Sequence, residues 1–249
     1  MIMTRRIAVG LSKGGVGKTT TAINLAHGLS RLGQKVLIVD TDTQGQASKA
    51  LGIIADFSLA DLLTGGATNE QVFIPARENL WIVAGGRSLA GLKRYLDRKE
   101  LGAESALSET LEKIESNYDF VVLDTAPSWD VLNVNGLIYA REILMPVSLE
   151  ALTLQALADY QESVNAVKKY NKELELKYVL PTFYDKRVKK SQEFMDQLNK
   201  FFDGRVCDPI RYNVKLSEAP AFGRSIFEHD SHSHGAIDYA KLIKRILAQ

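Results

Sequence analysis

Ser12-Lys13-Gly14-Gly15-Val16-Gly17-Lys18-Thr19-Thr20 joins two segments of opposite character. The apolar run 7–11 before it is typical of a buried strand. After Gly17 the apolar residues recur at the three-and-four spacing of a helix with one buried face: Ala22, Leu25, Ala26 and Leu29. Glycines let main-chain N–H groups turn toward phosphate oxygens, and a helix N-terminus adds partial positive charge. The stretch therefore predicts a loop that holds the phosphates of a nucleotide.

The side chains of this loop match the same chemistry. We expect Lys18 to reach the β- and γ-phosphates of ATP and the Thr19 hydroxyl to be a ligand of Mg²⁺. The expected ATP contacts are Lys13, Gly14, Gly15, Val16, Gly17, Lys18, Thr19 and Thr20.

Apolar runs and helical patterns alternate along the rest of the chain. Residues 36–39 form a second strand pattern that ends at Asp40, and a strand–helix–strand unit of this length predicts parallel strands. Further strands are expected at 80–83, 120–123, 143–147 and 177–180, and helices at about 105–117, 153–170, 190–202 and 236–247. We predict an α/β fold of the P-loop NTPase type, with one doubly wound domain over residues 1–249. Its sheet is mostly parallel and is flanked by helices on both faces, with ligands beyond the carboxyl ends of the strands.

Two apolar strands of this pattern end in a carboxylate. Asp124 follows the run 120–123, where a Walker B residue beside a phosphate loop would hold Mg²⁺ through water. Asp40 ends the run 36–39, and Asp42 follows it. The residues that this pattern predicts at the metal site are Thr19 and Asp124.

Composition excludes several classes of protein. The 249 residues are 45% hydrophobic and 24% charged, and no apolar run reaches the ~18 residues that a membrane span needs. The segment 1–6 lacks the apolar region of a signal peptide, and because the chain starts directly before a strand we expect no preceding helix-turn-helix domain. Cys207 is the only cysteine, which fits a cytoplasmic setting without disulfides.

Charge is unevenly distributed although the net charge is only +1. Residues 186–224 hold nine lysines and arginines but five acids. An anionic partner is therefore expected to bind this segment.

The pattern Lys-Gly-Gly-x-Gly-Lys-Thr-Thr at 13–20 resembles the deviant P-loop of the ParA/MinD superfamily, with Ser12 in place of the ordinary first glycine. The resemblance implies a homodimer in the ATP-bound state, in which Lys13 reaches the nucleotide of the partner subunit. It also implies that Asp42 orients the attacking water and helps to hold the Mg²⁺ shell, and that Asp40 supports the metal site, with both carboxylates acting mainly through water. With Lys18, the residues expected to act in catalysis are thus Lys13 and Asp42. Thr43 stands where the family usually has proline.

The segment 212–223 is similar to a late stretch of Soj-type ParA proteins, which lies near the nucleotide base. Arg211 and Asn213 are therefore expected to contact ATP, although 210–213 departs from the usual Ile-Pro-Arg-Asn. Soj-type proteins bind double-stranded DNA without sequence preference and associate with the nucleoid. A ParB-like or adaptor protein stimulates their hydrolysis of ATP. The basic residues expected to contact DNA here are Arg187, Lys189, Lys190, Lys215 and Arg224.

Other classes of function compete with this interpretation. A MinD-like protein that cycles on a membrane would need an amphipathic C-terminal helix. Residues 236–249 place Ile237, Ala240, Ile243 and Leu247 on one side, but a helix packed on the domain gives the same pattern. The single cysteine argues against a relative of the nitrogenase iron protein, whose subunits share a cluster. Intact Lys18, Asp42 and Asp124 argue against a non-catalytic scaffold, and we expect no membrane partner.

Overall fold

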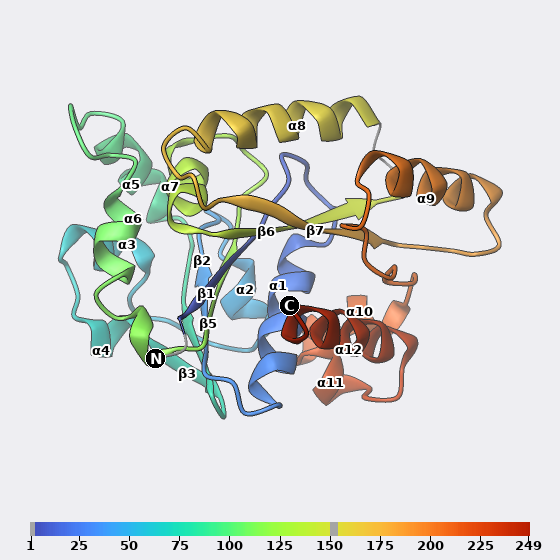
Figure 1. Ribbon diagram of the computed structural model, residues 1–249. Coiled ribbons are helices and arrows are strands. Elements are labelled where there is room, and N and C mark those ends of the chain that lie inside the picture. The colour runs from blue at the N-terminus through green and yellow to red at the C-terminus, as the bar shows by residue number, and fades with distance from the viewer. Residues whose placement is uncertain (1–2, 150–153) are drawn as a thin grey trace.

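A seven-stranded sheet forms the centre of the computed structural model, which describes residues 3–149 and 154–249 (Figure 1). The strand order is β3-β4-β2-β5-β1-β6-β7. Neighbouring strands are parallel except for the antiparallel pair of β3 and β4 at one edge. The strands are β1 (Arg5–Val9), β2 (Val36–Asp40), β3 (Ile74–Arg77), β4 (Leu80–Val83), β5 (Phe120–Asp124), β6 (Glu142–Ser148) and β7 (Glu175–Thr182).

Helices connect these strands and cover both faces of the sheet. They are α1 (Lys18–Ser30), α2 (Gln46–Ala50), α3 (Leu59–Thr64), α4 (Asn69–Val72), α5 (Leu89–Leu96), α6 (Ala106–Leu111), α7 (Val131–Tyr139), α8 (Leu154–Val167), α9 (Lys189–Phe201), α10 (Val214–Glu218), α11 (Ile226–His229) and α12 (His234–Leu247), with short 3₁₀ helices η1 (Glu115–Asn117) and η2 (Ala219–Phe222).

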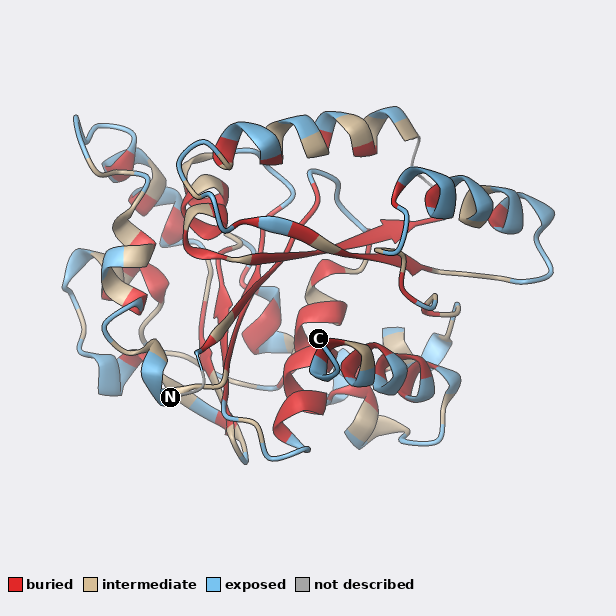
Figure 2. Ribbon diagram, in the orientation of Figure 1, coloured by how far each residue is buried: buried red, intermediate tan, exposed pale blue. Residues whose placement is uncertain are grey.

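The two faces of the sheet build two separate cores. Side chains alternate across a strand, so Ile7 and Val9 of β1 face one core and Ala8 the other. The first core packs against α1, α2, α11 and α12, and the second against α3 to α9. Strands β2, β5 and β6 are buried along their whole length, and the strands and α1 are mostly red in Figure 2. The predicted fold class, a doubly wound α/β fold of the P-loop type, is confirmed.

Most predicted elements are present, with shifted ends. The first strand begins at Arg5 instead of residue 7, because acidic side chains from distant parts of the sequence pair with the positive charges of both arginines. Arg5 forms a bidentate pair with Glu142, and Arg6 is paired with Glu115. The predicted helix 105–117 is instead α6 followed by η1. The predicted helix 153–170 corresponds to α8, and its first position, 153, lies outside the described residues.

The predicted apolar stripe of the C-terminal helix was wrong by about one residue. Ile237, Ala240 and Leu247 are exposed, and only Ile243 of that stripe is buried. The stripe that packs on α1 includes Tyr239, whose hydroxyl lies 3.1 Å from that of Thr21. The other buried apolar members are Ala236, Leu242 and Ile246. The apolar face of α12 is therefore covered within the fold.

The topology brings three strand ends together. Val9 of β1 lies in register with Asp124 of β5, which lies in register with Asp40 of β2. The loop after β1 leads into α1 at the same edge of the sheet. Within the described ranges, no helix is long and apolar enough to cross a lipid bilayer.

Candidate nucleotide-binding site

The loop between β1 and α1 has the backbone of a tight phosphate cradle. Gly15 and Gly17 have φ angles of 72° and 87°, a conformation that favours glycine. The Thr182 hydroxyl of β7 donates to the carbonyl of Val16 at 3.0 Å and fixes the loop against the sheet. Lys18, the first residue of α1, donates from Nζ to the carbonyl of Lys13 at 2.5 Å. The lysine thus folds back over the loop.

Lys18 is a buried cation, with only 7% of its surface exposed. Burial lowers the pKa of its ammonium group, and the charges of Asp124 and Asp42 oppose this shift. An anion above the loop would stabilise this ammonium further, because opposite charge favours the charged form of a buried group. The predicted ATP contacts at 13–20 are therefore brought together around one buried positive charge.

Among the described residues, Asp124 combines deep burial with carboxylate oxygens that lack ordinary hydrogen bonds. It is 1% exposed, and neither side-chain oxygen has a hydrogen-bond partner of normal geometry within that part of the chain. Burial raises the pKa of Asp124 well above its usual range, and the nearby Asp40 raises it further, whereas the Thr19 hydroxyl beside it lowers it. Two buried acceptors without partners are costly, so this position favours a bound cation or donor.

Asp40 differs because the backbone holds its carboxylate. The N–H groups of Asp42 and Ala47 donate to Oδ1 and Oδ2 at 2.9 and 3.0 Å. Burial nevertheless raises the pKa of Asp40 to about 7, while the two backbone hydrogen bonds lower it. Asp42 lies half-buried on the following loop.

These oxygens suit Mg²⁺, which prefers carboxylate, hydroxyl and water ligands. Among the described residues, no three acidic, histidine or cysteine side chains converge closely enough to chelate an ion by themselves. An ion beside Asp124 and Thr19 would therefore keep water or phosphate ligands, which is the usual coordination of Mg²⁺ in nucleotide sites.

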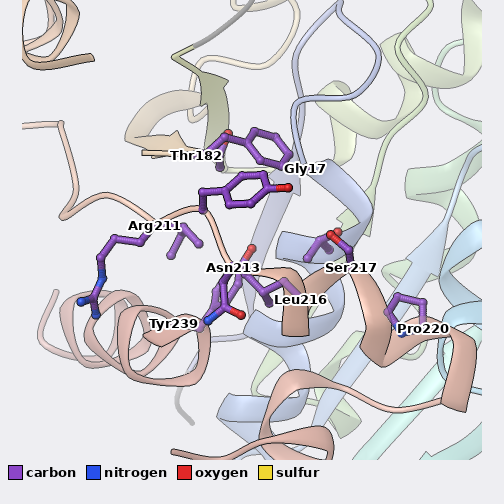
Figure 3. Close-up of a pocket in the computed structure, with 12 residues that line it drawn as sticks. Gly17, Thr182, Arg211, Asn213, Leu216, Ser217, Pro220 and Tyr239 are labelled. Carbon is purple, nitrogen blue, oxygen red and sulfur yellow. The ribbon is translucent and has the colours of Figure 1, made fainter. Parts of the chain in front are cut away.

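A pocket of about 270 Å³ opens beside Gly17 and Thr20 (Figure 3). Asn213 lines it, and its side-chain oxygen accepts the N–H of Lys215 at 2.8 Å. Arg211 also lines the pocket, but Figure 3 shows the end of its side chain directed away from the pocket centre, and Asp238 of α12 holds the guanidinium at 2.7 Å. The predicted nucleotide contact of Asn213 is thus placed at the pocket, whereas the Arg211 side chain is engaged elsewhere.

Three of the residues predicted to contact DNA lie around the start of α9. Arg187 is paired with Asp185 at 2.7 Å, and Lys189 with Glu193 at 3.7 Å. Arg187 and Lys190 line one hollow of about 430 Å³. All three side chains are exposed.

The other two predicted DNA residues lie near η2. Lys215 is paired with Glu218 at 2.9 Å, and Arg224 lines a hollow of about 220 Å³. The hollow at Arg187 shares Tyr212 with the 270 Å³ pocket, and the hollow at Arg224 shares Leu216 with it. The five residues therefore fall into two groups, one at the start of α9 and one near η2, and each group has a member in a hollow that borders the pocket.

Several residues of the site were missed by sequence reasoning. Thr182 ends β7 and Phe183 follows it, and both line the pocket; Phe183 has a φ of 55°, which is rare for a large side chain. Gly85 and Gly86 follow β4 and contact the loop of Asp40 and Asp42. A glycine pair directly after a predicted strand was the signal available for these two.

The fold and the loop define a class of protein: a P-loop nucleotide-binding protein with a parallel sheet. The sequence profile of a family described as an AAA domain matches residues 4–176. Two chromosome-partitioning ATPases named Soj are similar to the chain. The one from Treponema pallidum is 37% identical, and the match covers 95% of this chain and 94% of the relative. The one from Thermus thermophilus is 38% identical, and the match covers 98% of this chain and 96% of the relative.

A solved structure has a similar fold. A protein from Mycobacterium smegmatis named cobyrinic acid a,c-diamide synthase, with bound ADP and magnesium, has a TM-score of 0.85 and 29% identity. The match covers 98% of this chain and 94% of that one. The chain belongs to the Soj/ParA family of ATPases within the ParA/MinD superfamily.

Proposed function

We propose that the protein is an ATP-dependent dimerising switch. In the ATP-bound dimer it binds double-stranded DNA without sequence preference, and a ParB-like or adaptor protein stimulates its hydrolysis of ATP. The cycle partitions DNA or positions another cargo in the cytoplasm, on the nucleoid. Family membership supports this proposal. The observation that carries it is the buried Lys18, whose charge interacts with the buried Asp124, a carboxylate without a hydrogen bond of normal geometry among the described residues.

The residues of the site have distinct proposed roles. Lys18 would neutralise the β- and γ-phosphates, and the loop amides of 14–17 would hold their oxygens. Thr19 and Asp124 would hold Mg²⁺, which neutralises phosphate charge when bound. Asp40 would fix the loop that carries Asp42 through its hydrogen bond with the Asp42 N–H. Asp42 would then orient the water that attacks the γ-phosphate.

The proposed dimer explains the exposed loop that carries Lys13. A cation that a second subunit supplies would stabilise the charge on the transferred phosphoryl oxygens. Arginine fingers that do this raise the rate by about 10³–10⁵. We therefore assign Lys13 to the nucleotide of the partner subunit and expect slow hydrolysis in a monomer.

The membrane-cycling alternative receives no support from α12. An interfacial helix would present its apolar face to lipid. Here that face, including Tyr239 and Ile246, packs inside the fold. The relative named for diamide synthesis illustrates that this fold serves other chemistry, so the proposal depends on the site and on family membership rather than on the fold.

Co-sedimentation tests the proposal directly. With ATP and magnesium, the protein should sediment with long double-stranded DNA and stay in the supernatant with anionic vesicles, whereas ADP should leave it unbound in both. Sedimentation with vesicles but not DNA would replace the proposal with the membrane-cycling function.

A further inference from the structure

Two glycines that follow β4 after Ala84, Gly85 and Gly86, lie against the loop that carries Asp40 and Asp42. We infer that Gly85 is a positioning residue for ATP hydrolysis, because it sets the place of Asp42 by direct contact with the Asp42 backbone. The inference rests on the proposed role of Asp42 in orienting water.

Hydrogen bonds hold the Asp42 backbone from two sides. Its carbonyl accepts the N–H of Gly45 and the N–H of Gly86, both at 3.0 Å. Its own N–H donates to Oδ1 of Asp40 at 2.9 Å. The loop after β4 is therefore a second support of Asp42, in addition to the loop's own turn.

The contact at Gly85 leaves no room for a side chain. A Cβ atom there would lie 2.6 Å from the carbonyl oxygen of Asp42 and 2.7 Å from Oδ1 of Asp40. Neither neighbour is the end of a flexible chain. The first is backbone, and the second is a fully buried carboxylate that Ala47 also holds. Any residue other than glycine at this position must shift the Gly85 loop and the Asp42 loop relative to each other.

The two glycines are required for different reasons. Gly86 has a φ of 131°, a conformation that other residues rarely adopt, but a Cβ atom on it would meet nothing within 4 Å. At Gly85 the requirement is space alone, because its φ lies outside the left-handed region. Substitution of Gly85 by alanine thus tests the contact without forcing a strained backbone at that residue.

The expected defect is in the chemical step. A displacement of about 1 Å in a positioned group costs about 10²-fold in rate. The three atoms nearest to a Cβ at Gly85 all belong to Asp40 and Asp42. Nucleotide binding by the loop 13–20 should therefore persist when Gly85 changes.

The experiment compares Gly85→Ala with Gly91→Ala in steady-state phosphate release from ATP. Gly91 lies on the exposed side of α5, where a Cβ atom would meet nothing within 4 Å, so it is the matched control. We expect Gly85→Ala to lower kcat about 10- to 100-fold with KM changed less than about threefold. Gly91→Ala should keep both constants. Wild-type kcat in Gly85→Ala would overturn the inference.

A double-mutant comparison identifies the route of the effect. If Gly85 acts through Asp42, then adding Gly85→Ala to Asp42→Ala should cause little further loss. If the double variant instead loses kcat by the product of the two single-variant factors, the positioning role of Gly85 is overturned. Wild-type turnover in Asp42→Ala alone would instead contradict the proposed function of that residue, so the two failures are distinguishable.

A second variant covers the case in which Gly85→Ala does not fold. A Cβ atom on Gly45 would lie 3.1–3.2 Å from the backbone of Gly85 and Gly86, so Gly45→Ala crowds the same contact from the Asp42 loop, with added backbone strain because Gly45 has a φ of 57°. It should show the same loss in kcat at nearly constant KM. A loss confined to KM would overturn the inference.

Discussion

Asp40 and Asp124 stand directly opposite each other at the ends of neighbouring parallel strands, and both are at most 1% exposed. Asp40 receives two backbone hydrogen bonds, whereas the Asp124 oxygens receive none of normal geometry from the described residues. Two buried acids so close together destabilise the protein in the absence of a bound cation. Functional sites often contain such groups, which lower the stability of the folded protein but are needed for its activity.

The first prediction concerns the pH dependence of stability in the nucleotide-free protein. The pKa of Asp40 is raised from 3.8 to about 7, and that of Asp124 is raised in the same direction. The folded protein then binds more protons than the unfolded chain, so this contribution favours folding at low pH and is lost as pH rises through about 7. These groups should lower the free energy of unfolding by on the order of 2 kcal/mol between pH 5 and 8.

Urea unfolding in EDTA at the two pH values measures this loss. Asp124→Asn should shrink the difference and stabilise the protein at pH 8. Asp203→Asn, a change at an exposed acid after α9, is the control and should leave the difference intact. An identical pH dependence in wild type and Asp124→Asn would show that the pair is not strained.

The second prediction concerns the dimer. Lys13→Ala and Asp42→Ala should each lower turnover by about 10²-fold or more, because each removes one part of the same catalytic arrangement. If Lys13 acts on the partner subunit's nucleotide, a mixed dimer of the two variants contains one complete site. Phosphate release should therefore recover when the two inactive variants are mixed. Activity that stays at the level of the separate variants would place Lys13 in its own subunit's site.

The third prediction concerns DNA. Each cation that contacts a phosphate contributes about 0.9 to the slope of log K against log salt. Arg187→Ala with Lys215→Ala should weaken retention of the ATP-bound protein on DNA and reduce that slope by about 2. The matched control is Lys172→Ala, at an exposed lysine that precedes β7, whereas Arg187 follows the opposite end of this strand. Unchanged salt dependence in the double variant would show that Arg187 and Lys215 do not contact DNA and that the DNA-binding surface lies elsewhere.

The fourth prediction concerns the phosphate loop. Lys18→Ala removes a charge-assisted contact to the phosphates and should weaken ATP binding on the order of 100-fold in calorimetric titration. Lys35→Ala, at an exposed lysine before β2, should bind as wild type does. Equal affinity in the two variants would contradict the assignment of Lys18.

The convergence of the loop 13–20 with Asp40 and Asp124 was predictable because its signals are local. Residues 13–20 are contiguous, and Asp40 and Asp124 each end an apolar run, so strand order alone brings them together. The contacts of Gly85 were not predictable, because its partners lie more than 40 residues earlier in the chain. The same holds for Thr182, which fixes a loop 166 residues away.

The start of β1 and the buried face of α12 could not be predicted from local sequence, because both depend on contacts with residues far away in the chain. Arg5 and Arg6 look like a polar leader in the sequence, yet Glu142 and Glu115 allow them to begin β1. In α12, Tyr239 has a polar hydroxyl but is buried against Thr21, whereas Ile237 and Leu247 remain exposed. Hydrophobic periodicity alone could not identify the stripe that faces α1.

The most direct test is a crystal structure with a non-hydrolysable ATP analogue and magnesium. The β- and γ-phosphates should lie on the loop 13–20 within hydrogen-bond distance of Lys18 Nζ, with the metal beside Thr19 and Asp124. A structure in which the nucleotide binds elsewhere while this loop stays empty would contradict the account.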